Sequence, residues 1–510
     1  MTRYGPKKYK RHHTVRRALV LRGENLGQRV VHGAGFTFLG IILRVLITLV
    51  SVAVLARLLS PADFGYLAMA TVVTELASLF GNFGFASVLI QKRLITRLQI
   101  DTVFWASALL GLCLTSAVFL LSFAASWLFH APLAGELMRV MCLTFAIDGL
   151  VVVHGALISR LMRFHVDFWI QILSVLFRTA VAIVFAWQGF GVWSLVAGAL
   201  AGSALRVLLS LLVIPYMPRL RFNLRYLQST WKTNTSYFAG GFIFYVNSNV
   251  DLFLIGRMLG ATALGYYQNS RSLTDEVRYR IAVPLQRVLF PAFSSLQHNT
   301  NWLQASVLRS GRLLAATVFP VGIGIAAISN ELVPVLYGAK WLAMIPILKL
   351  LAIATAIKAS TSIATPLFNA KNRVGLALRY DILGAVIVIL SVWIASHWGI
   401  NAVAGALALT ALYSLVHYRV GLGLIGLTWN DVGAMLAPPA LASTLMWLAI
   451  EGARILLAGK IGNVGTSLAL HVAFGATVYP LVLVMINRAI LEDFKAVLAK
   501  MRPAPPQANK

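Results

Sequence analysis

Three charged residues lie on one predicted helix face in the middle of the chain. Asp275 and Arg278 follow Arg271 by four and seven positions, a spacing that places all three side chains together. A charge at the centre of a bilayer costs about 2.5–3.5 kcal/mol, so this face must contact protein or a water-filled cavity. Arginine is well suited to phosphate, because its planar guanidinium group forms paired hydrogen bonds with the oxygens.

Six further ionisable residues fall near the middle of apolar runs, namely Arg44, Glu75, Asp148, Arg178, Lys349 and Lys358. With the three above, the set has more cations than acids, so internal pairing cannot neutralise it. A surplus of positive charge in a dry pocket is costly unless an anion binds there. We therefore expect a cationic cavity that binds a phosphate or an acidic sugar, lined by Arg271, Arg278, Lys358, Lys349, Arg44 and Arg178.

The acids are expected to have other roles. Asp148 has no cation three or four positions away, and a carboxyl group in a low dielectric can bind a proton near neutral pH. Asp148 or Glu75 could therefore take part in ion coupling, or could instead form ion pairs with Arg44 or Arg178. Asp275 and Asp251 are predicted to be structural pairing partners.

The sequence offers little support for other chemistry. Cys113 and Cys142 lie in apolar runs and are expected to pack as small hydrophobic side chains. We find neither metal-ligand spacing nor a phosphate-binding G-x-x-x-x-G-K-[ST] loop. The prediction is a protein with no catalytic residues, no metal and no cofactor.

The composition indicates a polytopic membrane protein. The mean hydropathy is +0.79, and 59% of the residues are hydrophobic while only 12% are charged. The 44 Lys and Arg residues outnumber the 16 Asp and Glu residues, but they lie at the ends of apolar runs and not on one binding face. This distribution favours membrane topology over nucleic-acid binding.

Apolar runs near the roughly 20 residues needed to span a bilayer predict an all-α protein with about fourteen transmembrane helices. Their approximate ranges are 33–56, 64–90, 102–129, 137–160, 167–187, 191–213, 236–258, 264–296, 306–330, 344–368, 376–397, 400–424, 434–454 and 465–487. Gly198 and Gly202 form a G-x-x-x-G pattern, which predicts close helix packing.

Lys and Arg alternate between loops in a way that predicts cytoplasmic N- and C-termini. The expected outer loops at 130–136, 188–190 and 397–400 carry none, whereas the expected inner loops are basic. The exceptions to this pattern are Arg57, Arg257, Lys340, Arg454 and Lys460.

A motif recurs after 200 residues. Residues 55–66 (LARLLSPADFGY) align with residues 255–266 (IGRMLGATALGY), with Arg, Leu, Gly and Tyr at matching positions. Six predicted helices separate the copies, which indicates two parallel repeats around a central site. The predicted organisation is a basic cytoplasmic tail at 1–32, a six-helix lobe at 33–214, a cytoplasmic linker at 215–235, a second six-helix lobe at 236–424, an appended helix pair at 425–490 and a cytoplasmic tail at 491–510.

Four motifs, in order, resemble those of the bacterial polysaccharide flippase family. They are residues 55–65 (LARLLSPADFG), residues 84–92 (GFASVLIQK), the segment from DLFLIGR at 251–257 to GYY at 265–267, and RVLFPA at 287–292. The resemblance covers about residues 35–375. It does not extend to the basic N-terminal tail or to the appended helix pair.

This family belongs to the multidrug/oligosaccharidyl-lipid/polysaccharide exporter superfamily. The resemblance implies a two-lobed flippase that moves undecaprenyl-diphosphate-linked oligosaccharides across the bacterial inner membrane by alternating access, driven by an ion gradient. Expected partners are the lipid-linked oligosaccharide, membrane lipids, and a polysaccharide polymerase and glycosyltransferases. The alternatives are a multidrug antiporter, which would need acids in its cavity, and a polysaccharide polymerase or ligase, which would need larger outer loops.

Overall fold

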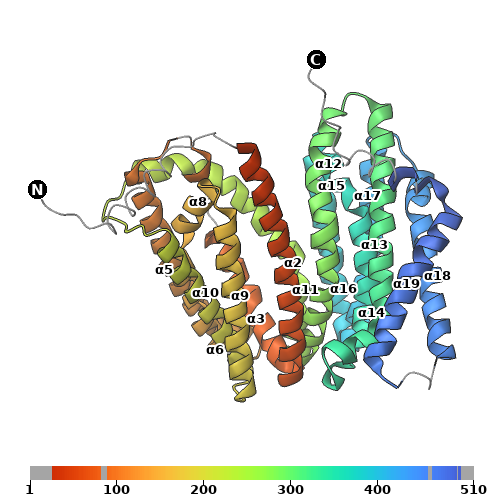
Figure 1. The fold of residues 1–510 in the computed structure, drawn as a ribbon, viewed down its shortest axis with the longest axis horizontal. Coiled ribbons are helices and arrows are strands. Elements are labelled where there is room, and N and C mark those ends of the chain that lie inside the picture. The colour runs from red at the N-terminus through yellow and green to blue at the C-terminus, as the bar shows by residue number, and fades with distance from the viewer. Residues whose placement is uncertain (1–25, 82–88, 93, 458–461, 491, 495–510) are drawn as a thin grey trace, which may run out of the picture. The chain divides into compact units, whose positions relative to one another are not determined.

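The structure of the protein is a computed structural model that describes residues 26–81, 89–92, 94–457, 462–490 and 492–494 (Figure 1). For residues 26–34, 38, 225, 228–244, 247 and 277 it describes the backbone alone. Most of the two predicted tails, and residues 84–88 of the second family motif, lie outside the described residues. The described residues form two compact units, one made of those up to Gly265 and the other of those from Tyr266 onward.

The first unit is built from long helices, some of which are interrupted. They are α2 (Leu26–Leu58), α3 (Pro61–Gly81), α5 (Arg97–Leu128), α6 (Pro132–Met141), α7 (Leu143–Gly149), α8 (Val152–Arg160), α9 (Phe164–Trp187), α10 (Trp193–Val213) and most of α11 (Leu224–Val277). The predicted span at 137–160 is a bent pair, in which Pro132–Gly149 and Val152–Arg160 meet at 42°. The range predicted as a linker contains the start of α11.

The G-x-x-x-G pattern does mark close packing, as predicted. A Cβ atom built on Gly198 would lie 2.7 Å from the carbonyl oxygen of Arg178, and one built on Gly202 would lie 2.8 Å from the Cβ atom of Arg178. Side chains at either position would push α10 away from α9. The two glycines therefore set the spacing of this helix pair.

The second unit continues the chain from the end of α11. Its elements are the π-helix η1 (Arg278–Ala282), α12 (Val283–Ser295), α13 (Thr300–Leu336), η2 (Ala339–Trp341), α14 (Met344–Ser360), η3 (Thr361–Ile363), α15 (Ala364–Ala370), α16 (Val374–Ala395), η4 (Ser396–Trp398), α17 (Ile400–Gly423), α18 (Trp429–Leu456) and α19 (Val464–Ile486). In this unit α13 packs against α14, α18 and α19, and α14 packs against α17.

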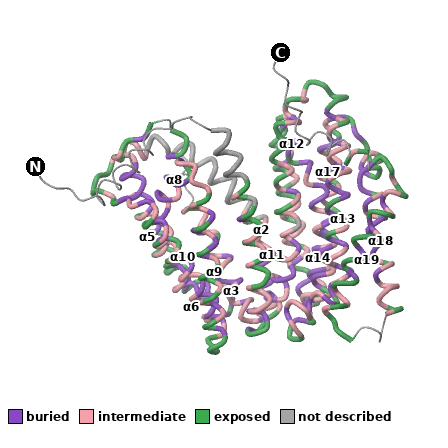
Figure 2. Tube along the Cα trace, viewed as in Figure 1, coloured by how far each residue is buried: buried purple, intermediate pink, exposed green. Residues whose placement is uncertain are grey.

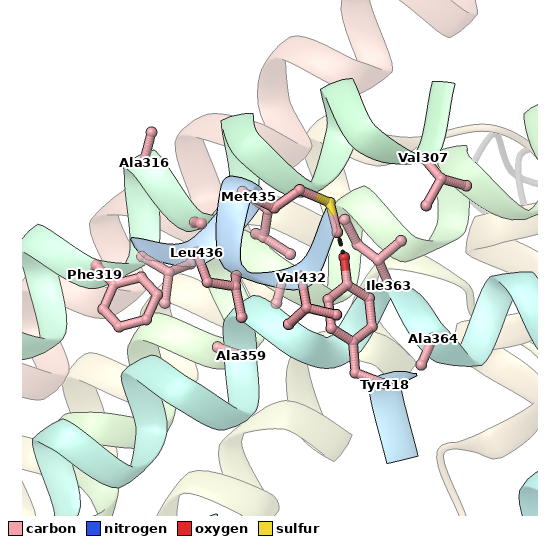
Figure 3. Close-up of a cluster of buried hydrophobic side chains, with 14 of the residues drawn as sticks. Val307, Ala316, Phe319, Ala359, Ile363, Ala364, Tyr418, Val432, Met435 and Leu436 are labelled. Carbon is pink, nitrogen blue, oxygen red and sulfur yellow. Dashed lines mark hydrogen bonds between the residues drawn. The ribbon is translucent and has the colours of Figure 1, made fainter. Parts of the chain in front are cut away.

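Burial separates central from peripheral helices in this unit. In α13 and in the segment from α14 to α15, 56% and 61% of the most apolar stretch is buried, against 11% in the segment formed by α16 and η4. Figure 2 marks the buried residues along α13 and α14 in purple. The centre is an apolar cluster in which the Tyr418 hydroxyl donates to the Met435 sulfur at 3.4 Å (Figure 3). On α16 the apolar side chains of Leu390 and Trp393 are exposed, as expected for a helix that faces lipid.

Helices occupy each of the fourteen predicted ranges, and the described chain is that of an all-α polytopic membrane protein. Among the described residues, eleven helices are long and apolar enough to span a membrane, or twelve if the bent pair counts as one span. The two predicted ranges outside this count, 236–258 and 264–296, lie in the polar stretch from α11 to α12. The number fourteen therefore stays a prediction.

Both copies of the repeated motif interrupt a helix at the same place. The first break separates α2 from α3 around Ser60, and the second lies at Gly260 inside α11, where φ is +80° and ψ is −177°. After the breaks the two chain segments touch. A Cβ atom on Gly65 would lie 1.7 Å from the carbonyl oxygen of Ala261, and one on Gly265 would lie 1.9 Å from that of Pro61. A shift of 200 residues relates Gly65 to Gly265 and Pro61 to Ala261, so it converts one contact into the other.

Candidate functional site

The charged face at the end of α11 contains an ion pair. The Nε atom of Arg271 lies 3.2 Å from Oδ2 of Asp275, one helical turn away, and both side chains are largely buried. A partly buried carboxylate satisfies part of the hydrogen-bonding capacity of the guanidinium and offsets its charge. The pair holds Arg271 in place inside the second unit.

Arg278 differs from Arg271 because it lies at a change in helix type. It is the first residue of the π-helix η1, and its guanidinium carbon is 5.8 Å from the centre of the Tyr279 ring. Pro284 follows, and a proline cannot donate a backbone hydrogen bond to the carbonyl four residues earlier, which favours a wider turn there. Among the described residues, no carboxylate lies within ion-pairing distance of Arg278.

The two lysines of α14 lie in different surroundings. Helix α14 contacts η1, and the side chain of Lys358 is half-buried near the end of α14. Lys349 lies two and a half turns earlier and acts electrostatically on the carboxylate of Glu451 in α18. Lys358 therefore lies near the junction of α14 and η3, whereas the charge of Lys349 acts on Glu451 of α18.

In the first unit Arg44 joins a chain of polar side chains. Its Nη2 atom donates to Oε1 of Gln171, and Gln171 Nε2 donates to Oδ2 of Asp167 at 2.6 Å. These residues line a small cavity between α2 and α9, with aromatic walls formed by Phe36 and Phe168. Arg44 is exposed, so this cavity presents a guanidinium group backed by an amide and a carboxylate.

The remaining candidates of the first unit do not gather at Arg44. One carboxylate oxygen of Asp148, in α7, is buried without a hydrogen-bond partner among the described residues. The charge that acts on this carboxylate is that of Arg206 in α10, not Arg44 or Arg178 as the sequence suggested. The side chain of Arg178 packs beside Gly202 at the α9–α10 contact.

Glu75 and Asp251 lie in contrasting positions. Glu75 is exposed on α3, and its backbone carbonyl accepts a hydrogen bond from Ser78 at 2.6 Å. Asp251 is buried in α11, where its carboxylate accepts from the backbone N–H of Leu252 at 2.9 Å. The two acids therefore differ in exposure, and Glu75 is the more accessible one.

Two partly buried polar clusters were not predicted from the sequence. Glu331, Glu451, Arg454 and His471 join α13, α18 and α19, and the only sequence signal was that Arg454 departs from the basic-loop pattern. The second cluster anchors the 214–223 loop, where the Tyr216 hydroxyl donates to Asp101. Burial, and then the bond to Asp101, raise the pKa of Tyr216 well above its ordinary value.

The architecture is that of a polytopic helical membrane protein with several charged side chains buried among its helices. Residues 54–346 match the model of the "Polysaccharide biosynthesis protein" family, and the chain belongs to that family.

Two relatives carry related names. The chain is 27% identical over 398 residues to the lipopolysaccharide biosynthesis protein WzxC of Escherichia coli (strain K12), covering 77% of this chain and 79% of that protein. It is 23% identical over 464 residues to the succinoglycan biosynthesis transport protein ExoT of Rhizobium meliloti (strain 1021), covering 89% and 92%.

Solved structures share the fold. A lipid II flippase MurJ in an inward closed conformation aligns with a TM-score of 0.69 at 17% identity, over 90% of this chain and all of that one (100%). An inward-facing multidrug resistance transporter of the MATE family aligns with a TM-score of 0.58 at 14% identity, over 75% and 94%. At these identities the similarity establishes the fold alone.

Proposed function

We propose that the protein is a flippase that translocates undecaprenyl-diphosphate-linked oligosaccharide repeat units across the bacterial inner membrane. The product would supply exopolysaccharide, capsule or O-antigen biosynthesis, and the protein itself would perform no chemical reaction. Membership of the polysaccharide biosynthesis family, the names of its relatives and the flippase-like fold support this proposal.

The observation that carries the proposal is the contrast between Arg271 and Arg278. One guanidinium is paired with Asp275, and the other lies at a π-turn with no carboxylate within ion-pairing distance among the described residues. Helix turns of this type are frequent at functional sites. A diphosphate would bind Arg278 first and then compete with Asp275 for Arg271, with Lys358 as a further cation.

Arg44 is the corresponding candidate in the first unit. Gln171 holds its guanidinium group at the wall of a cavity, which limits the side-chain entropy lost when an anion binds. Arg178 and Lys349 are weaker candidates, because one packs at a helix contact and the other faces Glu451. Asp148 and Glu75 remain the proposed coupling acids of this unit.

The test is the double substitution Arg271→Ala and Arg278→Ala in cells that lack the native gene. Each lost charged contact should cost about 1.5–3 kcal/mol of substrate binding, so transport should fall about tenfold or more. The measurement is surface polysaccharide output, together with the abundance of the protein in the membrane.

Arg280→Ala is the matched control, because Arg280 pairs with the exposed Glu276 one turn away in the same segment. Its output should stay near normal. Normal output from the double variant at normal abundance would overturn the proposed substrate site. Loss of the protein itself would instead show that the two arginines are needed for folding.

The proposal includes a topology with both termini in the cytoplasm and a location in the inner membrane, where a polymerase and glycosyltransferases would act on the same lipid-linked chain. A reporter that is active only in the periplasm should give signal when fused after residue 398 and none when fused after residue 225. Equal amounts of both fusions must be present in the membrane. The opposite pattern would contradict the predicted orientation and the predicted number of helices.

A further inference from the structure

A group of ionisable side chains joins three helices of the second unit. Arg454 of α18 contacts Glu331 of α13 with two nitrogens, Nε at 2.7 Å from Oε1 and Nη2 at 2.9 Å from Oε2. The same Nη2 donates to the carbonyl oxygen of Ala327 at 2.7 Å. Glu331 is only 6% exposed, so this two-point contact lies in the interior. The proposed substrate site does not use any of these residues.

The cluster is balanced in charge before any histidine is counted. Nη1 of Arg454 also donates to Glu451, whose other oxygen accepts from the indole N–H of Trp447 at 3.1 Å. Lys349 of α14 acts on the same Glu451 carboxylate. Two carboxylates therefore face two permanent cations, and one added proton would make the group positive.

His471 of α19 completes the cluster and is its one group without a fixed charge. It is 2% exposed, and its Nδ1 atom lies 3.4 Å from Oε1 of Glu331 and 3.3 Å from Oγ of Ser467. An ionised carboxylate can only accept hydrogen bonds, so Nδ1 carries the hydrogen of the neutral ring. The lone pair is then on Nε2, which is buried and has no hydrogen-bond partner among the described residues.

We propose that His471 and Glu331 form a proton-binding site, in which Nε2 of His471 accepts the proton and the Glu331 carboxylate stabilises the resulting imidazolium. Histidine is the side chain whose ordinary titration lies nearest to neutral pH. Protonation of Nε2 would make the ring positive and turn the contact between Nδ1 and the Glu331 carboxylate into an ion pair. The step moves one proton from water to nitrogen and needs no other reactant.

The position of the site fits a proton taken from one side of the membrane. Glu331 lies near the end of α13, Arg454 near the end of α18 and His471 near the start of α19. Counting the predicted helices from a cytoplasmic N-terminus places these ends on the periplasmic side. Glu451 is partly exposed, so the cluster is open to the protein surface at that end. The imidazolium would also repel Arg454, which shares Oε1 of Glu331 with it, and would loosen the hold of α18 on α13.

The idea that this proton helps to drive transport rests on the proposed function. The existence of the proton-binding site does not depend on it. The first experiment therefore measures proton binding alone. The full-length protein carrying isotope-labelled histidine is titrated from pH 5 to pH 8 by NMR, and the His471 signal is assigned as the one lost in His471→Asn. His154 of α8 is the matched control, because its Nε2 is also buried without a hydrogen-bond partner among the described residues, whereas its Nδ1 lies 3.2 Å from the carbonyl oxygen of Leu150 and not beside a carboxylate.

The expected result is a titrating His471 signal whose midpoint moves to lower pH in Glu331→Gln, since the imidazolium then lacks its carboxylate. Glu451→Gln should move it less, because Glu451 pairs with Arg454 and not with the ring. If Glu331→Gln fails to fold, the titration of His471 in the wild type and in Glu451→Gln still tests whether the site binds a proton. A His471 signal that stays unchanged from pH 5 to pH 8 would overturn the site.

The second experiment places the protein in liposomes with a fluorescent undecaprenyl-diphosphate-linked sugar and compares flipping with and without a pH gradient. His471→Asn should keep gradient-independent flipping and lose the acceleration by the gradient, whereas Arg271→Ala with Arg278→Ala should lose both. Full acceleration in His471→Asn would overturn the coupling role. Absence of flipping by the wild type would instead overturn the proposed function, and the titration would still decide the proton site.

Discussion

The two copies of the repeated motif break their helices at the same position by different means. In the first copy α2 ends at Leu58 and the next helix begins at Pro61, with Asp63 capping its start. Its carboxylate accepts from the Ser60 backbone N–H at 2.8 Å and from the Ser60 hydroxyl at 2.7 Å. In the second copy the corresponding residues are Gly260 and Ala263, and the break consists of one glycine at φ +80°.

What the copies share is the backbone contact that follows the break. Gly65 meets Ala261, and Gly265 meets Pro61, each so closely that a Cβ atom would overlap a carbonyl oxygen. The four positions are two pairs related by the 200-residue shift. The comparison indicates that the close approach of the two segments is what the repeat maintains, while the chemistry of the break itself can vary.

The largest effect is therefore expected from Gly65→Ala and Gly265→Ala. Each added Cβ atom meets a backbone oxygen that cannot rotate away, at 1.7 or 1.9 Å, so the segments must separate. Forced overpacking of this kind costs about 3 kcal/mol. The measurement is the thermal unfolding midpoint of the purified protein in detergent, and the two variants should fall by similar amounts if the contact is reciprocal.

Gly405→Ala is the control for this pair, because Gly405 lies inside α17 with no atom within 4 Å of a built Cβ. Alanine there should leave the midpoint unchanged or raise it, since alanine is favoured over glycine in a helix by about 1 kcal/mol. A drop in only one member of the pair would show that the two copies do not support each other equally.

Gly260→Ala should have a smaller effect for a different reason. A Cβ atom there meets nothing within 4 Å, so space is not limiting. The backbone angles of φ +80° and ψ −177° fall in a region that is nearly restricted to glycine, and an alanine there costs about 2 kcal/mol. The same unfolding assay measures it. Stability equal to that of Gly405→Ala would mean that the chain can break elsewhere in α11.

The sequence predicted local features well. Helix positions follow from apolar runs, and the Arg271–Asp275 pair follows from a one-turn spacing that any helix would impose. Close packing at Gly198 and Gly202 could be predicted because small residues on one face allow two helices to approach.

Contacts between distant segments could not be predicted in this way. Glu331 and Arg454 are 123 positions apart, and only the packing of α18 on α13 brings them together. The partner of Arg44 is Gln171, an uncharged residue 127 positions away that a search for opposite charges passes over. The charge beside Asp148 belongs to Arg206 for the same reason, because the fold and not the spacing selects the neighbour.

The smallest effect is expected from Asp63→Ala, which removes the cap that only the first copy has. Loss of a capping side chain costs about 1 kcal/mol. Asp431→Ala is a matched comparison, because Asp431 accepts from the Thr428 backbone N–H at 2.7 Å and from the Thr428 hydroxyl at 2.9 Å at the start of α18, away from the repeat. If the cap at Asp63 serves only to begin a helix, both variants should lower the unfolding midpoint by the same amount, and Asp63→Asn should recover most of the loss. A larger drop in Asp63→Ala than in Asp431→Ala would mean that the cap also holds Pro61 against Gly265, so that the two copies would depend on the chemistry of the break after all.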